Sequence, residues 1–152
     1  MNKKVFAVPF LALTLALFFA VAPALAADPV DDIQAGNEAA REGNFERAIE
    51  LYNRAIESGL LSPGNLAVVY NNRGSALDDS GQVDQAIVDY TKAVKLDPSY
   101  AEAYYNRSFA YEKKKEFAKA LADVKKAASL DPADPLYSQR REYLKDQVSK
   151  HK

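Results

Sequence analysis

The chain has 152 residues, with 20 lysines and arginines against 21 aspartates and glutamates, so its charges nearly cancel. A balanced charge gives no steering towards nucleic acid or an anionic surface, because such steering depends on excess positive charge. Cysteine is absent and the single histidine is His151. Disulfides, thiolate zinc sites, thiol catalysis and histidine clusters are therefore excluded.

Residues 1–26 have the composition of a secretory signal peptide. Two lysines give a basic start, an apolar run covers 5–22, and the Ala-Leu-Ala at 24–26 fits the small-x-small rule for signal peptidase. An uncleaved membrane anchor is the alternative, since a run of this length could almost span a bilayer. Pro23 would break a helix just before the motif, which favours cleavage and a mature chain that begins at Ala27. The segment predicts a periplasmic or secreted protein.

The rest of the chain repeats itself at a fixed interval. Leu96-Asp97-Pro98 returns 34 residues later as Leu130-Asp131-Pro132. The residues that precede each copy also match at this step: Tyr70, Arg73, Gly74, Leu77, Ala86, Tyr90 and Ala93 correspond to Tyr104, Arg107, Ser108, Tyr111, Ala120, Val124 and Ala127. An earlier, less regular copy has Gly36, Ala39, Ala48, Tyr52 and Ala55. Fixed periods between 20 and 50 residues are typical of repeat architectures.

This pattern resembles the tetratricopeptide repeat, whose signature joins aromatic-x2-Leu-Gly-x2-Tyr with Ala-x3-Phe and a closing proline. The resemblance covers about residues 29–134. It implies an all-α fold, a right-handed α-solenoid of helix-turn-helix repeats, within a single domain at 27–152. The expected units are repeats at about 29–66, 67–100 and 101–134, and a capping helix at about 135–149. A solenoid needs such a cap because its last repeat would otherwise expose an apolar face. Leu136, Tyr143 and Leu144 are expected to supply the large apolar groups of this cap.

Glycines and Asp-Pro pairs predict where the helices end and begin. Gly43 and Gly81 fall where the first helix of a repeat must stop, because glycine enters a left-handed cap without strain. The third repeat has Lys115 at this place, and we expect it to lose some turn stability. Asp97-Pro98 and Asp131-Pro132 are expected to open the next helix, with Asp as N-cap and Pro in the first turn.

One spacing departs from the period. Ala48 and Ala86 are separated by 38 residues, and the four extra residues fall within 57–65. Gly59 would end one helix, and Ser62-Pro63 has the form of an N-cap followed by a first-turn proline. A longer connecting loop is favoured, and a functional loop is the alternative.

No residue pattern typical of an enzyme is present, and no Gly-rich phosphate loop occurs. Asp78, Asp79 and Glu112 could be paired carboxylates or calcium ligands, but charged residues at helix ends usually form a solvated face. The lysines of 113–115 and 119–126 could face an anionic wall polymer or lipid headgroup, although acidic residues interleave them. We therefore expect no enzyme activity, no cofactor and no metal site.

In a repeat solenoid the first helices of successive repeats line a concave surface. Residues left over from the packing faces are expected there: Ile33, Gln34, Asn37, Asn71, Asn72, Ser75, Asp79, Tyr105, Asn106, Phe109, Lys113, Gln139, Arg140 and Tyr143. The predicted peptide-binding groove is the subset Asn37, Asn72, Ser75, Asp79, Tyr105, Asn106, Phe109, Lys113 and Arg140. The resemblance implies that Asn72 and Asn106 hold a client backbone, since an amide side chain both donates and accepts. Solvent-facing asparagines without a client are the alternative. Neither asparagine is expected to matter much to folding, because both should point away from the packing faces.

Co-chaperone members of this family hold a terminal carboxylate with Lys and Arg side chains beside asparagines. The asparagines match at Asn37 and Asn72, but Ile33, Glu102 and Asn106 occupy the three basic places. The missing charge-assisted donors argue against such a carboxylate clamp.

These observations predict an exported scaffold or adaptor that binds a protein or peptide partner in its concave groove, in the bacterial envelope. Binding to nucleic acid is not expected, nor is membrane insertion after signal cleavage. A small ligand-binding protein or enzyme built on the repeat is one alternative, and a self-assembling solenoid is another.

Overall fold

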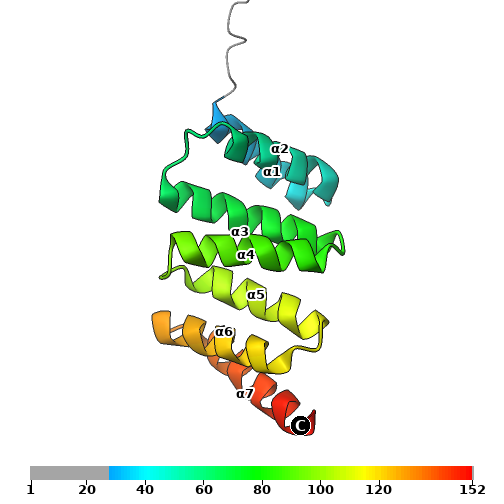
Figure 1. Ribbon diagram of the computed structural model, residues 1–152, viewed down its shortest axis with the longest axis vertical. Helices are drawn as coiled ribbons and strands as arrows, with labels where there is room; N and C mark the ends of the chain where they lie inside the picture. The colour runs from blue at the N-terminus through cyan, green and yellow to red at the C-terminus, as the bar shows by residue number, and fades with distance from the viewer. Residues whose placement is uncertain (1–27, 152) are drawn as a thin grey trace, which may run out of the picture.

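The computed structural model describes residues 28–151, and the expected signal peptide lies outside this part of the chain. The described part is all-α: its seven helices are α1 (Pro29–Arg41), α2 (Phe45–Glu57), α3 (Pro63–Asp79), α4 (Val83–Leu96), α5 (Ala101–Lys113), α6 (Phe117–Leu130) and α7 (Pro135–Lys150). Helices α1 and α2, α3 and α4, and α5 and α6 form pairs that stack along the long axis, and α7 packs on α6 (Figure 1). The predicted all-α solenoid is confirmed.

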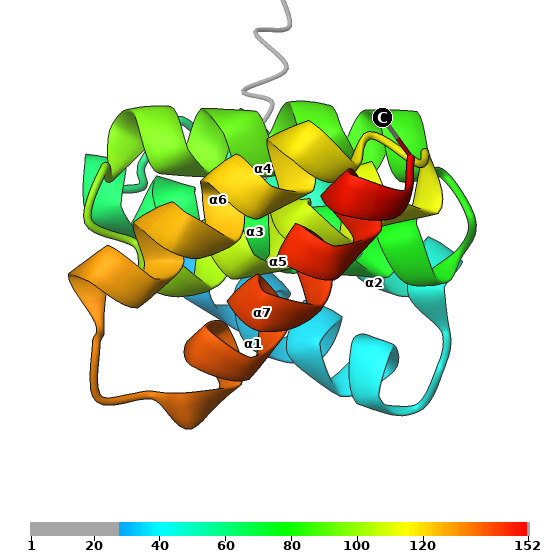
Figure 2. The ribbon, with the colours of Figure 1, turned by 90° about the horizontal axis from the view of Figure 1, so that it is seen from below.

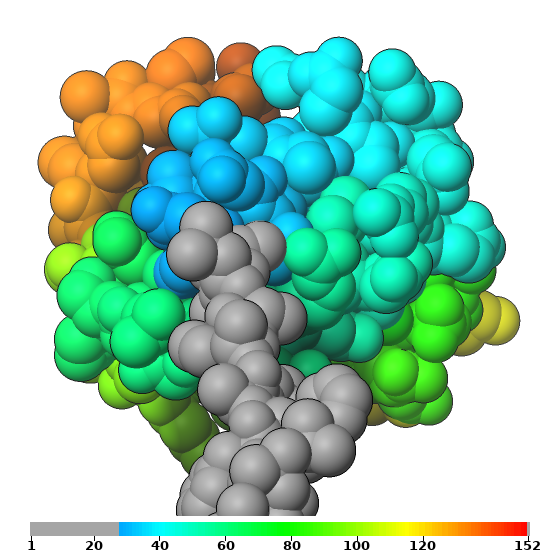
Figure 3. All heavy atoms as spheres, turned by 90° about the horizontal axis from the view of Figure 1, so that it is seen from above, coloured from blue at the N-terminus to red at the C-terminus, as the bar shows by residue number. Residues whose placement is uncertain are grey.

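The stack is twisted as well as layered. A view along it shows successive pairs turned relative to one another (Figure 2). From the N-terminal end, α1 and α2 form the outermost layer, and the orange segment near residue 130 comes into view beside them (Figure 3). None of the helices between residues 28 and 151 combines the length and apolar character that a bilayer crossing requires.

Each of the first two helix pairs closes around a tyrosine that lies against a glycine. A Cβ atom added to Gly36 would lie 2.7 Å from Tyr52 Cε1, and one added to Gly74 would lie 2.8 Å from Tyr90 Cε1. Both tyrosine rings are buried, with exposures of 1% and 2%. These two glycines are therefore small because an aromatic ring from the partner helix occupies the space of a side chain.

The third pair uses different residues at the same places of the repeat. Ser108 stands one period after Gly74, and Val124 stands one period after Tyr90; both are fully buried. Serine is larger than the glycine that it replaces, and valine is smaller than the tyrosine that it replaces, so the two changes compensate in volume. Alanines complete the seam of every second helix, and all six are fully buried: Ala48, Ala55, Ala86, Ala93, Ala120 and Ala127.

The turns within the pairs share one conformation. Gly43, Gly81 and Lys115 have φ values of 78°, 85° and 59°, so the expected left-handed position is confirmed in all three repeats. In each turn the following amide N–H donates back to the last turn of the helix, as Glu116 N does to Tyr111 O at 2.9 Å. Lys115 adopts a backbone conformation in which its Cβ is strained, whereas the two glycines avoid this cost.

The connections between pairs differ from the expectation. Asp97 and Asp131 end α4 and α6 as C-cap residues, and the next helices begin only at Ala101 and Pro135. Asp97 Oδ1 accepts hydrogen bonds from Ser99 N at 2.9 Å and Ser99 Oγ at 2.6 Å. Both bonds lower the pKa of the Asp97 carboxyl below its ordinary value. The N-cap prediction for the Asp-Pro pairs is wrong, because the aspartate closes a local turn.

The inserted segment before α3 ends in the helix start that the sequence predicts. Ser62 is the N-cap of α3, its Oγ accepts a hydrogen bond from Asn65 N at 3.2 Å, and Pro63 is the first helical residue. The prediction for Ser62-Pro63 is therefore confirmed.

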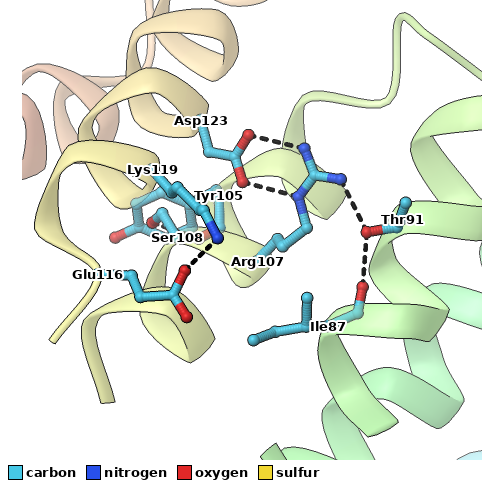
Figure 4. A network of polar contacts seen from close by, with 8 residues as sticks. All are labelled: Ile87, Thr91, Tyr105, Arg107, Ser108, Glu116, Lys119 and Asp123. Carbon is cyan, nitrogen blue, oxygen red and sulfur yellow. Dashed lines mark hydrogen bonds and ion pairs between the residues drawn. The ribbon is translucent and has the colours of Figure 1, made fainter. Parts of the chain in front are cut away.

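Half-buried arginines tie the second and third repeats to the repeat that precedes each of them. Arg107 of α5 donates from Nε and Nη2 to both oxygens of Asp123 in α6, at 2.7 and 2.8 Å (Figure 4). Its third nitrogen donates to Thr91 Oγ1 of α4 at 3.0 Å. One period earlier, Arg73 makes the same bidentate contact with Asp89 and also bonds Asn53. Each arginine thus joins three helices from two repeats, with the paired geometry that suits a guanidinium and a carboxylate.

Candidate functional site

One face of the stack carries a continuous groove made of three adjoining hollows of about 370, 360 and 350 Å³, which we call the N-terminal, central and C-terminal hollows. The first two share Ser75 and Asp79, and the last two share Phe109. The groove is lined mainly by α1, α3, α5 and α7. All nine predicted binding residues line it: Asn37, Asn72, Ser75, Asp79, Tyr105, Asn106, Phe109, Lys113 and Arg140. Their role in binding stays a prediction.

In the N-terminal hollow three side chains meet at one amide oxygen. Asn37 Oδ1 accepts from Tyr52 OH at 2.7 Å and from Asn72 Nδ2 at 3.0 Å. Burial raises the pKa of Tyr52 to about 12, so its phenol is a hydrogen-bond donor at neutral pH. Asn72 therefore links α3 to α1 through one of its two N–H groups.

A second amide contact links α5 to α3. Asn106 Nδ2 donates to Asn71 Oδ1 at 3.1 Å, and Asn71 Nδ2 donates to Tyr100 OH at 3.2 Å. Asn71 is only 1% exposed, so the expectation that it faces the open groove is wrong. It lies between the two helices, where its amide satisfies groups that packing removes from water.

Asn72 and Asn106 thus have a structural role as well as a place in the groove. The expectation that they matter little to folding does not agree with these hydrogen bonds between repeats. The amide oxygen of each makes no hydrogen bond to any residue within 28–151. Those two oxygens can accept from the N–H groups of an extended chain.

The central hollow contains one ion pair and one free acid. Lys113 Nζ of α5 lies 2.7 Å from Asp78 Oδ2 of α3. Asp79 is exposed beside this pair and makes no ion pair within the described residues. Tyr90 OH donates to Ser75 Oγ at 3.2 Å, and burial raises the pKa of Tyr90 well above its ordinary value.

The C-terminal hollow is aromatic. The rings of Tyr105 and Phe109 meet edge to face with centroids 5.0 Å apart, and Arg140 Cζ lies 3.6 Å from the Phe109 centroid. Arg140 also pairs with Glu112, which accepts a hydrogen bond from Tyr143 OH at 2.6 Å. The Arg140 side chain is only 12% exposed, so its charge is held by α5 and is not free in the groove.

Four polar side chains that line the groove were in neither list of expected residues: Arg41, Tyr52, Asp78 and Tyr90. The two tyrosines were expected only to pack between helices, but their hydroxyl groups reach the groove. The sequence contains one signal for this position of the hydroxyl groups. Tyr52 and Tyr90 stand where the repeat signature has phenylalanine, and a buried tyrosine hydroxyl usually finds a hydrogen-bond partner. Asp78 and Lys113 are separated by 35 residues, the same interval as Asn37 and Asn72.

The side chains considered as metal ligands do not gather into a site. Within residues 28–151 no three acidic or histidine side chains are placed to hold an ion. Asp78 and Glu112 are instead paired with Lys113 and Arg140. Lys114, in the turn that follows α5, is likewise paired, with Asp84.

Stacked helix pairs with a groove along their first helices define a repeat α-solenoid. A family model described as "TPR repeat" matches residues 74–115, and two models described as "Tetratricopeptide repeat" match 101–134 and 33–58. The chain belongs to the tetratricopeptide repeat family.

Among curated relatives, the TPR repeat-containing thioredoxin TTL4 of Arabidopsis thaliana is 46% identical over 70 residues, which cover 46% of this chain and 10% of the relative. The human DnaJ homolog subfamily C member 7 is 42% identical over 71 residues, covering 45% of this chain and 14% of that protein. The similarity thus spans a small part of these longer proteins and shows a shared repeat domain.

Solved structures of similar fold include peptide complexes. The second TPR domain of human RPAP3 in complex with the HSP70 peptide SGPTIEEVD has a TM-score of 0.68 and 27% identity, covering 77% of this chain and 98% of that one. The first TPR of Spaghetti bound to the HSP90 peptide SRMEEVD has a TM-score of 0.74 and 22% identity, covering 80% and 94%. The second likeness shows the fold alone.

Proposed function

We propose that this chain is an adaptor that binds an extended segment of a partner protein in the groove. The observation that carries the proposal is the placement of two unengaged amide oxygens, on Asn72 and Asn106, one repeat apart along a continuous groove that ends in an aromatic hollow. An extended backbone presents N–H groups to such acceptors, and Phe109 offers an apolar anchor. The RPAP3 domain, 27% identical to this chain, is solved in complex with a peptide, and this supports peptide binding by the repeat domain described above.

The residues at the basic places of a carboxylate clamp argue against an acid-ended peptide as the ligand. Asn106 is hydrogen-bonded to Asn71, and Glu102 is an exposed acidic residue. Ile33 is apolar. No charge-assisted donor therefore stands at these three places, and the proposed partner differs in chemistry from the HSP peptides of the similar structures.

The test is peptide display on the purified domain followed by calorimetry with the enriched peptide. Asn72→Ala should weaken binding about two- to tenfold, which corresponds to roughly 0.5–1.5 kcal/mol for one neutral hydrogen bond. Phe109→Ala should cost at least as much, because a central aromatic group tends to dominate binding. The matched control is Asn65→Ala, the same change at an exposed position of α3 outside the three hollows. Equal affinity for all these variants would exclude the groove as the binding site.

We further propose that the adaptor works outside the cytoplasm, in a bacterial envelope or after secretion. The proposal rests on the sequence of residues 1–26 alone. Intact-mass measurement on an envelope extract should give a mature chain that begins at Ala27. A full-length chain retained in the membrane fraction would contradict cleavage and favour the anchor.

A further inference from the structure

The cations that line the groove are already neutralised. Arg41 pairs with Glu38 at 2.5 Å, Lys113 pairs with Asp78 at 2.7 Å, and Arg140 pairs with Glu112. Arg140 is in addition stacked on Phe109. An anionic ligand would have to compete with an acidic side chain at each of these places, so the groove offers little attraction to negative charge.

Asp79 is the opposite case. It is exposed, it borders both the N-terminal and the central hollow, and no cation within residues 28–151 pairs with it. It is also the last residue of α3, where the carbonyl ends of the helix add partial negative charge.

The neighbouring Asp78 adds a second acidic side chain to the central hollow, which has Lys113 as its single cation. Asp78 Oδ1 is buried and has no hydrogen-bond partner among the described residues, although Oδ2 of the same side chain pairs with Lys113. The middle of the groove therefore has an excess of negative over positive charge.

We propose that the groove selects a partner segment with a lysine or arginine placed over Asp79 and an apolar or aromatic residue placed against Phe109. This inference rests on the proposed function and adds the chemistry of its partner. The central hollow contains both Asp79 and Phe109, so one short extended segment can reach both. A carboxylate-ended or acidic segment meets Asp79 without a free cation and is rejected.

The experiment starts from random ten-residue peptides displayed against the purified domain. The best enriched peptide is synthesised in three forms that carry arginine, glutamine or glutamate at its most enriched basic position, each with an amidated C-terminus. Fluorescence anisotropy should show the arginine form binding about three- to tenfold more tightly than the glutamine form, with the glutamate form weakest. The preference should shrink in 0.5 M salt, because screening weakens an exposed ion pair.

Two variants assign the preference to a residue. Asp79→Asn should bring the arginine and glutamine peptides to equal affinity. Glu57→Gln is the matched control, since Glu57 is likewise an exposed acid at the last position of a helix but lies outside the hollows. It should keep the full preference.

The inference is overturned if the library enriches acidic peptides, if a free C-terminal carboxylate improves binding, or if the arginine preference survives in Asp79→Asn. In those three cases a peptide still binds, and the proposed function stands if Asn72→Ala and Phe109→Ala weaken that binding. Failure of any peptide to enrich would remove the proposed function together with this inference.

Discussion

At the scale of single residues, amide side chains do two things in this groove. Asn72 and Asn106 each use one N–H to reach an asparagine of the preceding repeat and leave the amide oxygen unengaged. The two contacts are not equivalent. Asn37 keeps a second donor, Tyr52, whereas Asn71 receives its only hydrogen bond to Oδ1 from Asn106, among the described residues, and is buried.

This difference predicts unequal effects on stability. Asn106→Ala leaves the buried Asn71 oxygen without a donor and should lower the free energy of unfolding by about 1–3 kcal/mol. Asn72→Ala should cost about 0.5–1.5 kcal/mol, because Asn37 is still satisfied by the tyrosine. Urea unfolding of both variants measures the two costs. A larger loss for Asn72→Ala would contradict the hydrogen-bond assignment.

The buried tyrosines predict how stability changes at alkaline pH. The pKa of Tyr52 is raised from 10.0 to about 12 by burial, so the folded state favours the protonated phenol. The unfolded chain therefore loses its proton first, and the free energy of unfolding should fall as pH rises from about 10 towards 12. Tyr100, with a pKa also raised to about 12, acts in the same direction. Denaturant titrations at pH 9, 10 and 11 should show a shallower fall for Tyr52→Phe than for the parent; an identical slope would contradict the shifted pKa.

At the scale of helices and turns, the repeat depends on where each first helix stops. The third repeat makes the same left-handed turn as the others, with Lys115 in place of glycine. Lys115→Gly should therefore raise the free energy of unfolding by about 0.5–1 kcal/mol, because it relieves the strained conformation at the cost of some chain entropy. Gly81→Ala is the control with the opposite sign. Thermal unfolding of both variants tests this, and a destabilised Lys115→Gly chain would show that the lysine makes a compensating contact.

Much of the helical framework follows from the sequence, because it depends on local rules. Glycine at a helix end, alanine at the seam and Ser62-Pro63 at a helix start each act within a few residues. The prediction for Asp97 was wrong because its side chain could accept hydrogen bonds either within the connecting turn or from the first turn of the next helix. In the structure it accepts from Ser99, and the next helix begins only at Ala101. Asn71 was misplaced because its partners lie about one repeat away in the chain, and the periodic pattern does not say which side of α3 the next pair covers.

The same contrast between local rules and long-range contacts applies to the groove residues. Their common face follows from helical spacing, so all nine predicted positions lie together. Which of their charges are free does not follow from spacing. Lys113 pairs with Asp78 of α3, and Arg140 pairs with Glu112 of α5. Only the packing of neighbouring helices reveals that no cation within residues 28–151 pairs with Asp79.

At the scale of the whole molecule, stability is a sum over neighbouring helix pairs. Arginines at Arg73 and Arg107 strengthen two of these junctions by joining three helices each. The junction between α6 and α7 has no such arginine. Arg141 lies one period after Arg107, but it pairs with the adjacent Glu142. The contact of α7 with α6 therefore depends on apolar packing around Leu144, which is fully buried with Ala120 and Val124.

The buried face of α7 also corrects part of the expected cap. Leu136 and Tyr143 were expected to pack with Leu144, but they are 53% and 45% exposed and border the groove. Tyr137 is the second buried residue of this helix, 8% exposed and 4.9 Å from the Tyr105 ring.

Removal of α7 tests whether the stack needs this helix. A chain that ends at Pro135 would expose Val124 and Ala120 to water, so we expect a clearly lower unfolding midpoint or aggregation. Leu144→Ala isolates the packing contribution and should cost about 2–5 kcal/mol, as large-to-small changes at buried sites do. Tyr143→Ala, at an exposed site of the same helix, should change the unfolding free energy far less. Calorimetric melting of the three chains decides the point: if the shortened chain melts like the parent, α7 is not the cap of the stack, and α6 must be stable with its face open to solvent.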